Sequence, residues 1–215
     1  MTVVLSSSES VNQNIIFKEP HLILVEGADD QALSALMIRH EGLENFRVHN
    51  MTGKTSWNRR IGVIAKQPDF QQNVTSLGLL RDADDDPGAA WDSCIGALKF
   101  CSLPTPREAL ELAAGTPNTA IMVVPSRTRR GAVEELCMDS FPEPRLACVD
   151  QYFGCLGENG VAPTHAKGRI QVYLAGLRDN PRDLVVACKK GLLDMGHPAF
   201  DELRGFIRAL AVAQP

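Results

Sequence analysis

The sequence lacks any long hydrophobic run. No apolar stretch approaches the roughly 18 residues that are needed to cross a bilayer. The N-terminus also lacks a basic region followed by an apolar core, so it does not resemble a signal peptide. We therefore expect a cytoplasmic protein with no membrane partner.

The cysteines and histidines show none of the spacings of a zinc site. The six cysteines are scattered without a CxxC pair, and the five histidines form no cluster. Structural zinc sites combine such ligands at short, regular spacings. We expect reduced, mostly buried thiols rather than disulfides or bound zinc.

Positive charge is also scarce. The formal net charge is −4 at pH 7, and the pI is about 5.7, which gives no support for a strongly basic nucleic-acid binder. The acids are concentrated, because seven of the 26 lie within residues 26–30 and 82–86. A bound cation would neutralise part of this charge, and basic residues elsewhere remain available to form a patch.

Apolar segments of strand length alternate with segments of helical periodicity. Strands are predicted at residues 21–25, 43–49, 74–80 and 118–124, with a short edge strand at 15–17. Helices are predicted at residues 28–40, 56–66, 87–100, 131–140, 144–157, 163–178, 182–193 and 198–212. This alternation predicts an α/β fold with a central, mostly parallel sheet of about four strands flanked by helices. We expect one domain over residues 1–215, with an α/β core at 20–140 and a helical C-terminal extension at 144–215 packed on it.

Carboxylates follow two separate apolar strands. LILVEGADD contains Glu26, and LGLLRDADDD contains Asp82 and Asp84. Ligands of open parallel sheets bind beyond the carboxyl ends of the strands, so both groups should converge there. Two carboxylates about 4 Å apart repel each other by about 4 kcal/mol at an effective dielectric of 20, and a divalent cation reverses that sign. Oxygen ligands suit Mg²⁺ or Mn²⁺ better than zinc, so the sequence predicts such a site at Glu26, Asp82 and Asp84.

Two other interpretations account for part of this pattern. Asp85 and Asp86 are equally well explained as the start of a helix at Pro87, because acids there favour the helix dipole. That explanation suits Asp82 poorly, since Asp82 directly follows a buried strand. A phosphatase of the haloacid-dehalogenase kind also has a strand ending in DxD, although Asp86 stands where its Thr or Val is usual.

LVEGADD and LLRDADDDP together resemble the signature of Toprim domains, in which Glu-Gly follows one strand and Asp-x-Asp follows a later one. Over residues 20 to about 178 the arrangement is similar to the Toprim nucleases of the OLD (overcoming lysogenization defect) family. The resemblance implies a Toprim-like fold and a short standalone form without the ATPase. It also implies a second acid four residues after the glutamate, an acid on a later short helix and a lysine towards the C-terminus. These correspond to Asp30, to Glu134 or Glu135, and to Lys167.

Helical spacing separates some of the acids but not all of them. Glu134 lies three residues before Cys137 and flanks the buried face of its helix, whereas Glu135 points outward, so we prefer Glu134. Asp29 and Asp30 both lie near the inward side of their helix. Only the resemblance favours Asp30.

Basic residues near the same edge are candidates for phosphate contacts. Lys167 lies three residues before Ile170 on the inward face of its helix start. Arg127, Arg129 and Arg130 follow the fourth strand and are candidate nucleic-acid-binding residues. Exposed, solubilising side chains explain all four equally well.

The resulting hypothesis is a metal-dependent nuclease that cleaves phosphodiester bonds of DNA or RNA, with DNA favoured. Glu26, Asp82 and Asp84 would hold one Mg²⁺ or Mn²⁺ ion, and Asp30 and Glu134 would help to hold a second. The resemblance gives Lys167 the role of neutralising charge on the scissile phosphate.

The alternative is a non-catalytic nucleotide- or nucleic-acid-binding module that partners a separate ATPase in phage defence or DNA repair. The acidic pI and the small supply of arginine favour that alternative. The oligomeric state stays open, and a homo-oligomer is compatible with the sequence.

Overall fold

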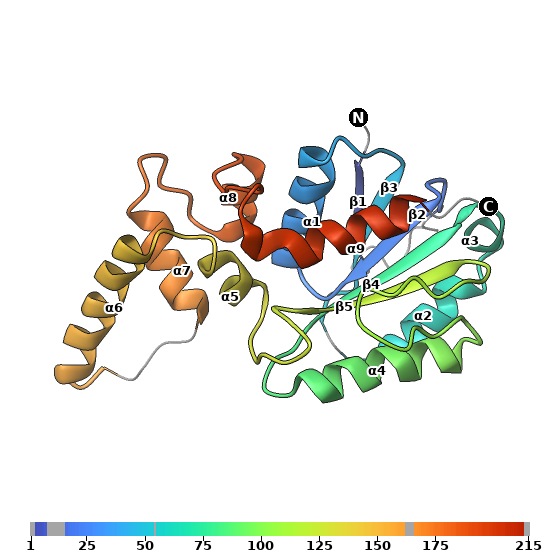
Figure 1. Cartoon of the computed structure of the whole chain (residues 1–215), viewed down its shortest axis with the longest axis horizontal. Coiled ribbons are helices and arrows are strands. Elements are labelled where there is room, and N and C mark those ends of the chain that lie inside the picture. The colour runs from blue at the N-terminus through green and yellow to red at the C-terminus, as the bar shows by residue number, and fades with distance from the viewer. Residues whose placement is uncertain (1–2, 8–15, 54, 162–165, 213–215) are drawn as a thin grey trace.

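A computed structural model describes residues 3–7, 16–53, 55–161 and 166–212, and its centre is a sheet of five parallel strands (Figure 1). The strands are β1 (Val3–Ser7), β2 (His21–Val25), β3 (Phe46–Asn50), β4 (Ser76–Asp82) and β5 (Asn118–Val124). Their order across the sheet is β1-β3-β2-β4-β5. The predicted α/β class is confirmed, and the architecture is consistent with a Toprim-like fold.

The sheet has five strands rather than about four, because β1 joins its edge beside β3. β1 reads VVLSS, and this short apolar segment of three residues is followed by further serines, so its sequence signal is brief. None of its five residues is fully buried. The predicted edge strand at 15–17 is wrong for residues 16 and 17, and residue 15 lies outside the described residues. Phe17 is instead a fully buried loop residue whose N–H donates to the Asp69 carboxylate.

Helices cover both faces of the sheet, with α2 and α4 on one face and α1 and α9 on the other (Figure 1). The α-helices are α1 (Ala28–His40), α2 (Trp57–Ala65), α3 (Pro68–Asn73), α4 (Pro87–Phe100), α5 (Val133–Met138), α6 (Glu143–Glu158), α7 (Ala166–Ala175), α8 (Leu184–Lys189) and α9 (Asp201–Val212). A 3-10 turn at Pro198–Phe200 precedes α9. Every predicted helix has a counterpart, and the short α3 is additional. Residues 163–165 of the helix predicted at 163–178 lie outside the described residues. Among the described helices, none is long and apolar enough to span a membrane.

Side chains of β2 alternate between two hydrophobic cores. Ile23 and Val25 face the core that includes residues of α1 and α9. Leu22 and Leu24 face the core that includes residues of α2 and α4. A parallel strand covered on both faces is apolar at successive positions, which explains the uninterrupted run that predicted β2.

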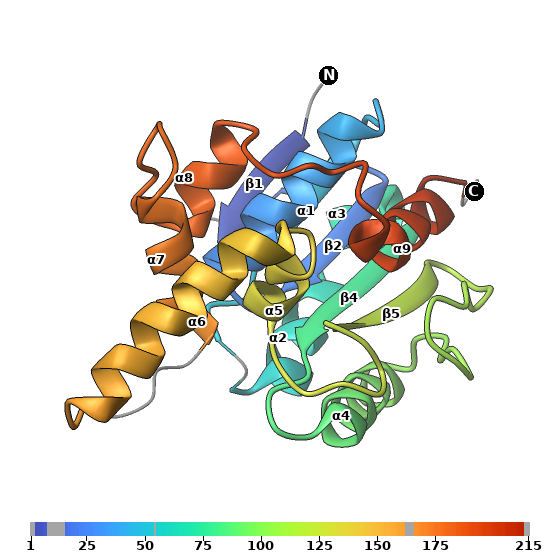
Figure 2. The same ribbon diagram turned by 60° about the vertical axis from the view of Figure 1, so that its left-hand side comes forward.

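The C-terminal helices continue the layer on the α1 face. A Cβ atom at Gly78 of β4 would lie 2.6 Å from side-chain atoms of Phe206 and of Leu210, so α9 approaches the strand closely because residue 78 is glycine. Helix α8 contacts α1, and α7 contacts α5 and α6. The pair α6 and α7 projects to one side of the sheet (Figure 2). The start of α7 brings Lys167 to the cavity beyond the carboxyl edge of the sheet.

Candidate metal centre at the carboxyl edge of the sheet

Glu26 and Asp82 reach the same edge because β2 and β4 are neighbours. Val25 lies opposite Leu80, so the next residues in register place Glu26 beside Arg81. Asp82 is the last residue of β4, and its Oδ1 atom accepts a hydrogen bond of 3.1 Å from the N–H of Val133. That bond ties the end of β4 to the start of α5.

Asp30 is buried at the start of α1, with 3% of its surface exposed. Its Oδ2 atom accepts a hydrogen bond of 2.9 Å from the N–H of Gly27. Its Oδ1 atom is buried and has no hydrogen-bond partner among the described residues. A buried carboxylate oxygen without a partner destabilises the fold unless a cation or a proton meets it. Asp29 differs, since its carboxylate lies 3.5 Å from the ammonium of Lys167.

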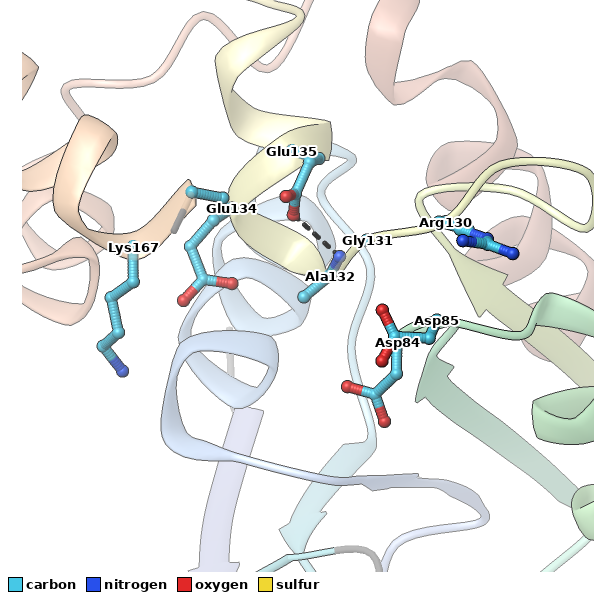
Figure 3. Close-up of a pocket in the computed structure, with 9 residues that line it drawn as sticks. Asp84, Asp85, Arg130, Gly131, Ala132, Glu134, Glu135 and Lys167 are labelled. Carbon is cyan, nitrogen blue, oxygen red and sulfur yellow. Dashed lines mark hydrogen bonds between the residues drawn. The ribbon is translucent and has the colours of Figure 1, made fainter. Parts of the chain in front are cut away.

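The two glutamates of α5 have separate roles. The Oε2 atom of Glu135 accepts a hydrogen bond of 2.8 Å from the N–H of Ala132, which caps the helix. Figure 3 shows Glu135 turned back towards Ala132, whereas Glu134 points away from it on the side of Lys167. Glu134 is buried, with 9% of its surface exposed. The structure therefore brings Glu134, and not Glu135, towards the other acids.

Glu26, Asp30, Asp82 and Glu134 form a carboxylate cluster whose members repel one another. Burial, followed by repulsion from the other three acids, raises the pKa of Asp82 to about 9. Burial also raises the pKa of Asp30 to about 7, and repulsion from Glu26 and Glu134 contributes to that shift. Burial likewise raises the pKa of Glu134. Protons therefore neutralise part of the cluster near neutral pH.

Two adjoining cavities collect these side chains. The first has a volume of about 460 Å³, and its lining includes Glu26, Asp29, Asp30, Asn50, Thr52 and Asp82. The second has a volume of about 410 Å³, and its lining includes Asp84, Asp85, Arg130 and Gly131. Glu134 and Lys167 line both cavities. The two cavities therefore meet at this pair, which Figure 3 shows opposite Asp84 and Asp85.

Asp84 lies away from Asp82 although two positions separate them in the sequence. The backbone of Asp84 has a left-handed φ of 48° and pairs with Gly131 through two hydrogen bonds of 2.8 Å. Gly131 itself has a φ of 126°, a conformation that favours glycine. Asp84 lines the second cavity, whereas Glu26 and Asp82 line the first. The three acids predicted to share one ion are thus divided between two cavities.

No group of three or more Asp, Glu, His or Cys side chains is already arranged to hold a metal ion within the described residues. The donor set nevertheless suits a hard divalent cation, because the cluster offers carboxylate oxygens alone. The buried Oδ1 atom of Asp30 has no hydrogen-bond partner among the described residues, and it would coordinate such a cation. A cation would need to draw these side chains together, and metal binding by them stays a prediction.

The three candidate arginines differ in their surroundings. The Arg127 guanidinium lies 4.2 Å from the centre of the Trp91 ring. Arg129 forms an ion pair of 2.6 Å with Asp139. Arg130 is exposed and lines the second cavity. Of the three, Arg130 is therefore best placed to meet a phosphate near the acids.

Arg81 is a further site residue that the sequence reasoning did not single out. It is buried in β4, and its Nε atom lies 3.7 Å from Oε2 of Glu26. Its guanidinium also lies 5.2 Å from the centre of the Trp57 ring and donates a hydrogen bond of 3.0 Å to Ser93. A charged residue inside an otherwise apolar strand, directly before Asp82, was the available signal.

The cysteines agree with the expectation of free thiols. All six are free, and Cys94, Cys137 and Cys188 are buried. Cys148 and Cys155 are exposed on α6, so burial is less general than expected.

The chain belongs to the DUF3226 family, described as a protein of unknown function, whose profile matches residues 20–212. A comparison with curated proteins found no match. Among solved structures, the C-terminal region of the Burkholderia pseudomallei OLD protein is similar, at 16% sequence identity and a TM-score of 0.40. That match covers 90% of this chain and 87% of the other.

Proposed function

We propose that this chain is a divalent-metal-dependent nuclease that cleaves phosphodiester bonds of nucleic acid with Mg²⁺ or Mn²⁺. The supporting observation is the carboxylate cluster, in which mutual repulsion and burial raise the pKa of Asp82 to about 9. Mutually repelling, buried acids lower stability unless a cation balances them. Such strongly shifted acids in a cavity are typical of functional sites.

In this proposal each of the two cavities holds one metal ion. Glu26, Asp30, Asp82 and Glu134 would hold one ion in the first cavity, and Asp84 with Glu134 would hold a second beside it. When bound, two such ions stabilise the attacking and leaving oxygens of an in-line displacement.

Basic side chains at the rim would orient the phosphate group. The side chain of Lys167 is 65% exposed and lines both cavities, so it can meet a phosphate placed between them. Arg130 would contact the backbone from the far side of the second cavity. Binding of nucleic acid, and the preference for DNA over RNA, remain predictions.

The test is incubation of the purified protein with supercoiled plasmid and Mn²⁺. We expect nicked product that disappears with a chelator and that falls by about a hundredfold or more in Asp82→Asn. Asp92→Asn, at an exposed acid on α4, is the matched control and should nick normally. Wild-type nicking activity in Asp82→Asn would contradict the proposed metal site.

A second candidate is a non-catalytic nucleic-acid-binding module that partners a separate ATPase. The absence of a ready-made metal group among the described residues favours it. Binding of DNA by the purified protein without any nicked product, in the same assay, would support this candidate over the nuclease. A haloacid-dehalogenase-like phosphatase would instead release phosphate from small esters.

A further inference from the structure

Arg81 is a cation that the fold itself places against the carboxylate cluster. The register of β2 and β4 sets it beside Glu26, and its exposed fraction is 8%. Ser93 and the Trp57 ring hold the other sides of its guanidinium. This positive charge is therefore fixed in place by three contacts and has little access to water.

The pair between Arg81 and Glu26 is electrostatic rather than a close hydrogen bond. The separation of 3.7 Å between Nε and Oε2 exceeds hydrogen-bond length. Within the described residues, Nε of Arg81 has no hydrogen-bond partner. Glu26 also lines the first cavity, so a cation in that cavity would meet a carboxylate that already faces a guanidinium.

We infer that Arg81 is a positioning residue that holds Glu26 in the metal-free protein and competes with the divalent cation for this carboxylate. The inference rests on the proposed function, because it concerns the ion that the nuclease would use. The fixed positive charge repels an incoming cation and lowers the affinity of the first cavity for it. Cation binding is then confined to higher metal concentrations.

A second buried Arg–Glu pair supplies a matched control. Arg47 in β3 lies 2.7 Å from Glu19, and its guanidinium lies 5.7 Å from the centre of the Phe17 ring. The side-chain exposures are 11% and 15%, against 10% and 15% for Arg81 and Glu26. Arg47 belongs to the amino end of the sheet, away from the carboxylate cluster. Its removal therefore breaks an ion pair of similar exposure without changing the charge at the cavity.

The experiment is calorimetric titration of Mn²⁺ into the wild type and three variants. Arg81→Gln should lower the Kd for Mn²⁺ by about tenfold or more, which corresponds to about 1.4 kcal/mol. Arg81→Lys keeps a positive charge at this position, and because that charge sets the affinity, the Kd for Mn²⁺ should stay within about threefold of the wild type. Arg47→Gln should bind Mn²⁺ as the wild type does.

Circular dichroism without metal checks that each variant folds, and Arg81→Met, which keeps an unbranched stem against Trp57, serves as a second neutral variant. Equal or weaker Mn²⁺ binding by both neutral variants overturns the inference. So does equal tightening by Arg47→Gln, an unfolded state for both neutral variants, or no Mn²⁺ uptake by any protein. Uptake in the expected order without plasmid nicking would reject the nuclease and keep the role of Arg81. Plasmid nicking by the wild type, together with a Kd for Mn²⁺ that is unchanged in Arg81→Gln and Arg81→Met, would keep the nuclease and reject the role of Arg81.

Discussion

One largely buried acid lies at each end of helix α1, and within the described residues only the one at the C-terminal end forms ion pairs. Glu41 follows the C-terminal end, with 6% of its side chain exposed. Its Oε1 atom lies 3.2 Å from Arg204, and Arg208 binds its other oxygen. Asp30, at the N-terminal end, is also buried, but one of its oxygens has no hydrogen-bond partner in the described part of the chain.

Glu41 has cationic partners that compensate for its burial, whereas burial of Asp30 lowers the stability of the metal-free fold. Two guanidinium groups offset the desolvation of the Glu41 carboxylate. The positive end of the α1 dipole offsets only part of the cost at Asp30, and protonation supplies the rest. A buried acid whose desolvation is not compensated by a cation is more typical of a ligand-binding site than of a stabilising contact.

The largest expected effect on stability is at Glu41, at the C-terminal end of α1. Glu41→Gln should lower the free energy of unfolding by about 2 kcal/mol, because Arg208 loses its partner carboxylate and Arg204 is left with Asp201. Urea denaturation measures this change, and the exposed Asp92→Asn is the control. A loss below about 0.5 kcal/mol, the range of ordinary surface changes, would mean that the two ends do not differ in this way.

Asp82→Asn should have the opposite sign and should stabilise the metal-free protein by about 1 kcal/mol or more at about pH 8. The folded pKa of about 9 lies above the usual 3.8, so the folded state binds the proton more tightly than the unfolded state does. Stability of the wild type therefore falls as pH rises between these two values. The advantage of the amide should be larger at about pH 8 than at about pH 7.

Thermal unfolding of both proteins in the presence of a chelator measures this difference. Burial lowers the pKa of His21, and it lowers that of His49 to about 4, so neither histidine charges in the folded protein within this range. The Asn Oδ1 atom can still accept the hydrogen bond from Val133. Destabilisation by Asp82→Asn, or an equal pH slope in both proteins, would contradict the raised pKa.

The smallest stability effect should come from Lys167→Ala. Its ion pair with Asp29 spans 3.5 Å and the lysine side chain is 65% exposed, so the free energy of unfolding should change by less than about 0.5 kcal/mol. Plasmid nicking should nevertheless fall by about tenfold or more, because the phosphate loses a positive charge. Wild-type nicking by this variant would leave Lys167 as a surface residue.

Within the described residues, local pattern was sufficient for strands β2 to β5, for the helices other than α3 and for part of the site. HLILV and the run ending at Asp82 are buried on both faces, so their apolar character predicted β2 and β4. Because ligands of parallel sheets bind beyond the carboxyl ends of the strands, the sequence also predicted that Glu26 and Asp82 lie near each other. Helical spacing also favoured Glu134 over Glu135, and the structure places Glu134 in the cluster. Whether these acids bind metal, and whether residues 1–215 form one domain, stay predictions.

Other features had no local signal. β1 has only three consecutive apolar residues before a serine-rich segment, and its place in the sheet depends on pairing with β3. The position of Asp84 depends on its pairing with Gly131, which lies 47 residues away. Asp29 and Asp30 could not be distinguished from the sequence, because both lie near the inward side of α1 and helical spacing does not rank two adjacent residues there.

The sequence by itself determined the α/β alternation and the location of acids after β2 and β4, because periodicity and strand ends are properties of short segments. The tertiary structure decided which acids share a cavity and which cation faces them. Strand register sets Arg81 against Glu26, and the turn at Asp84 moves its carboxylate to the second cavity. Such interactions depend on distances between segments remote in the chain, and electrostatic energy changes steeply with those distances.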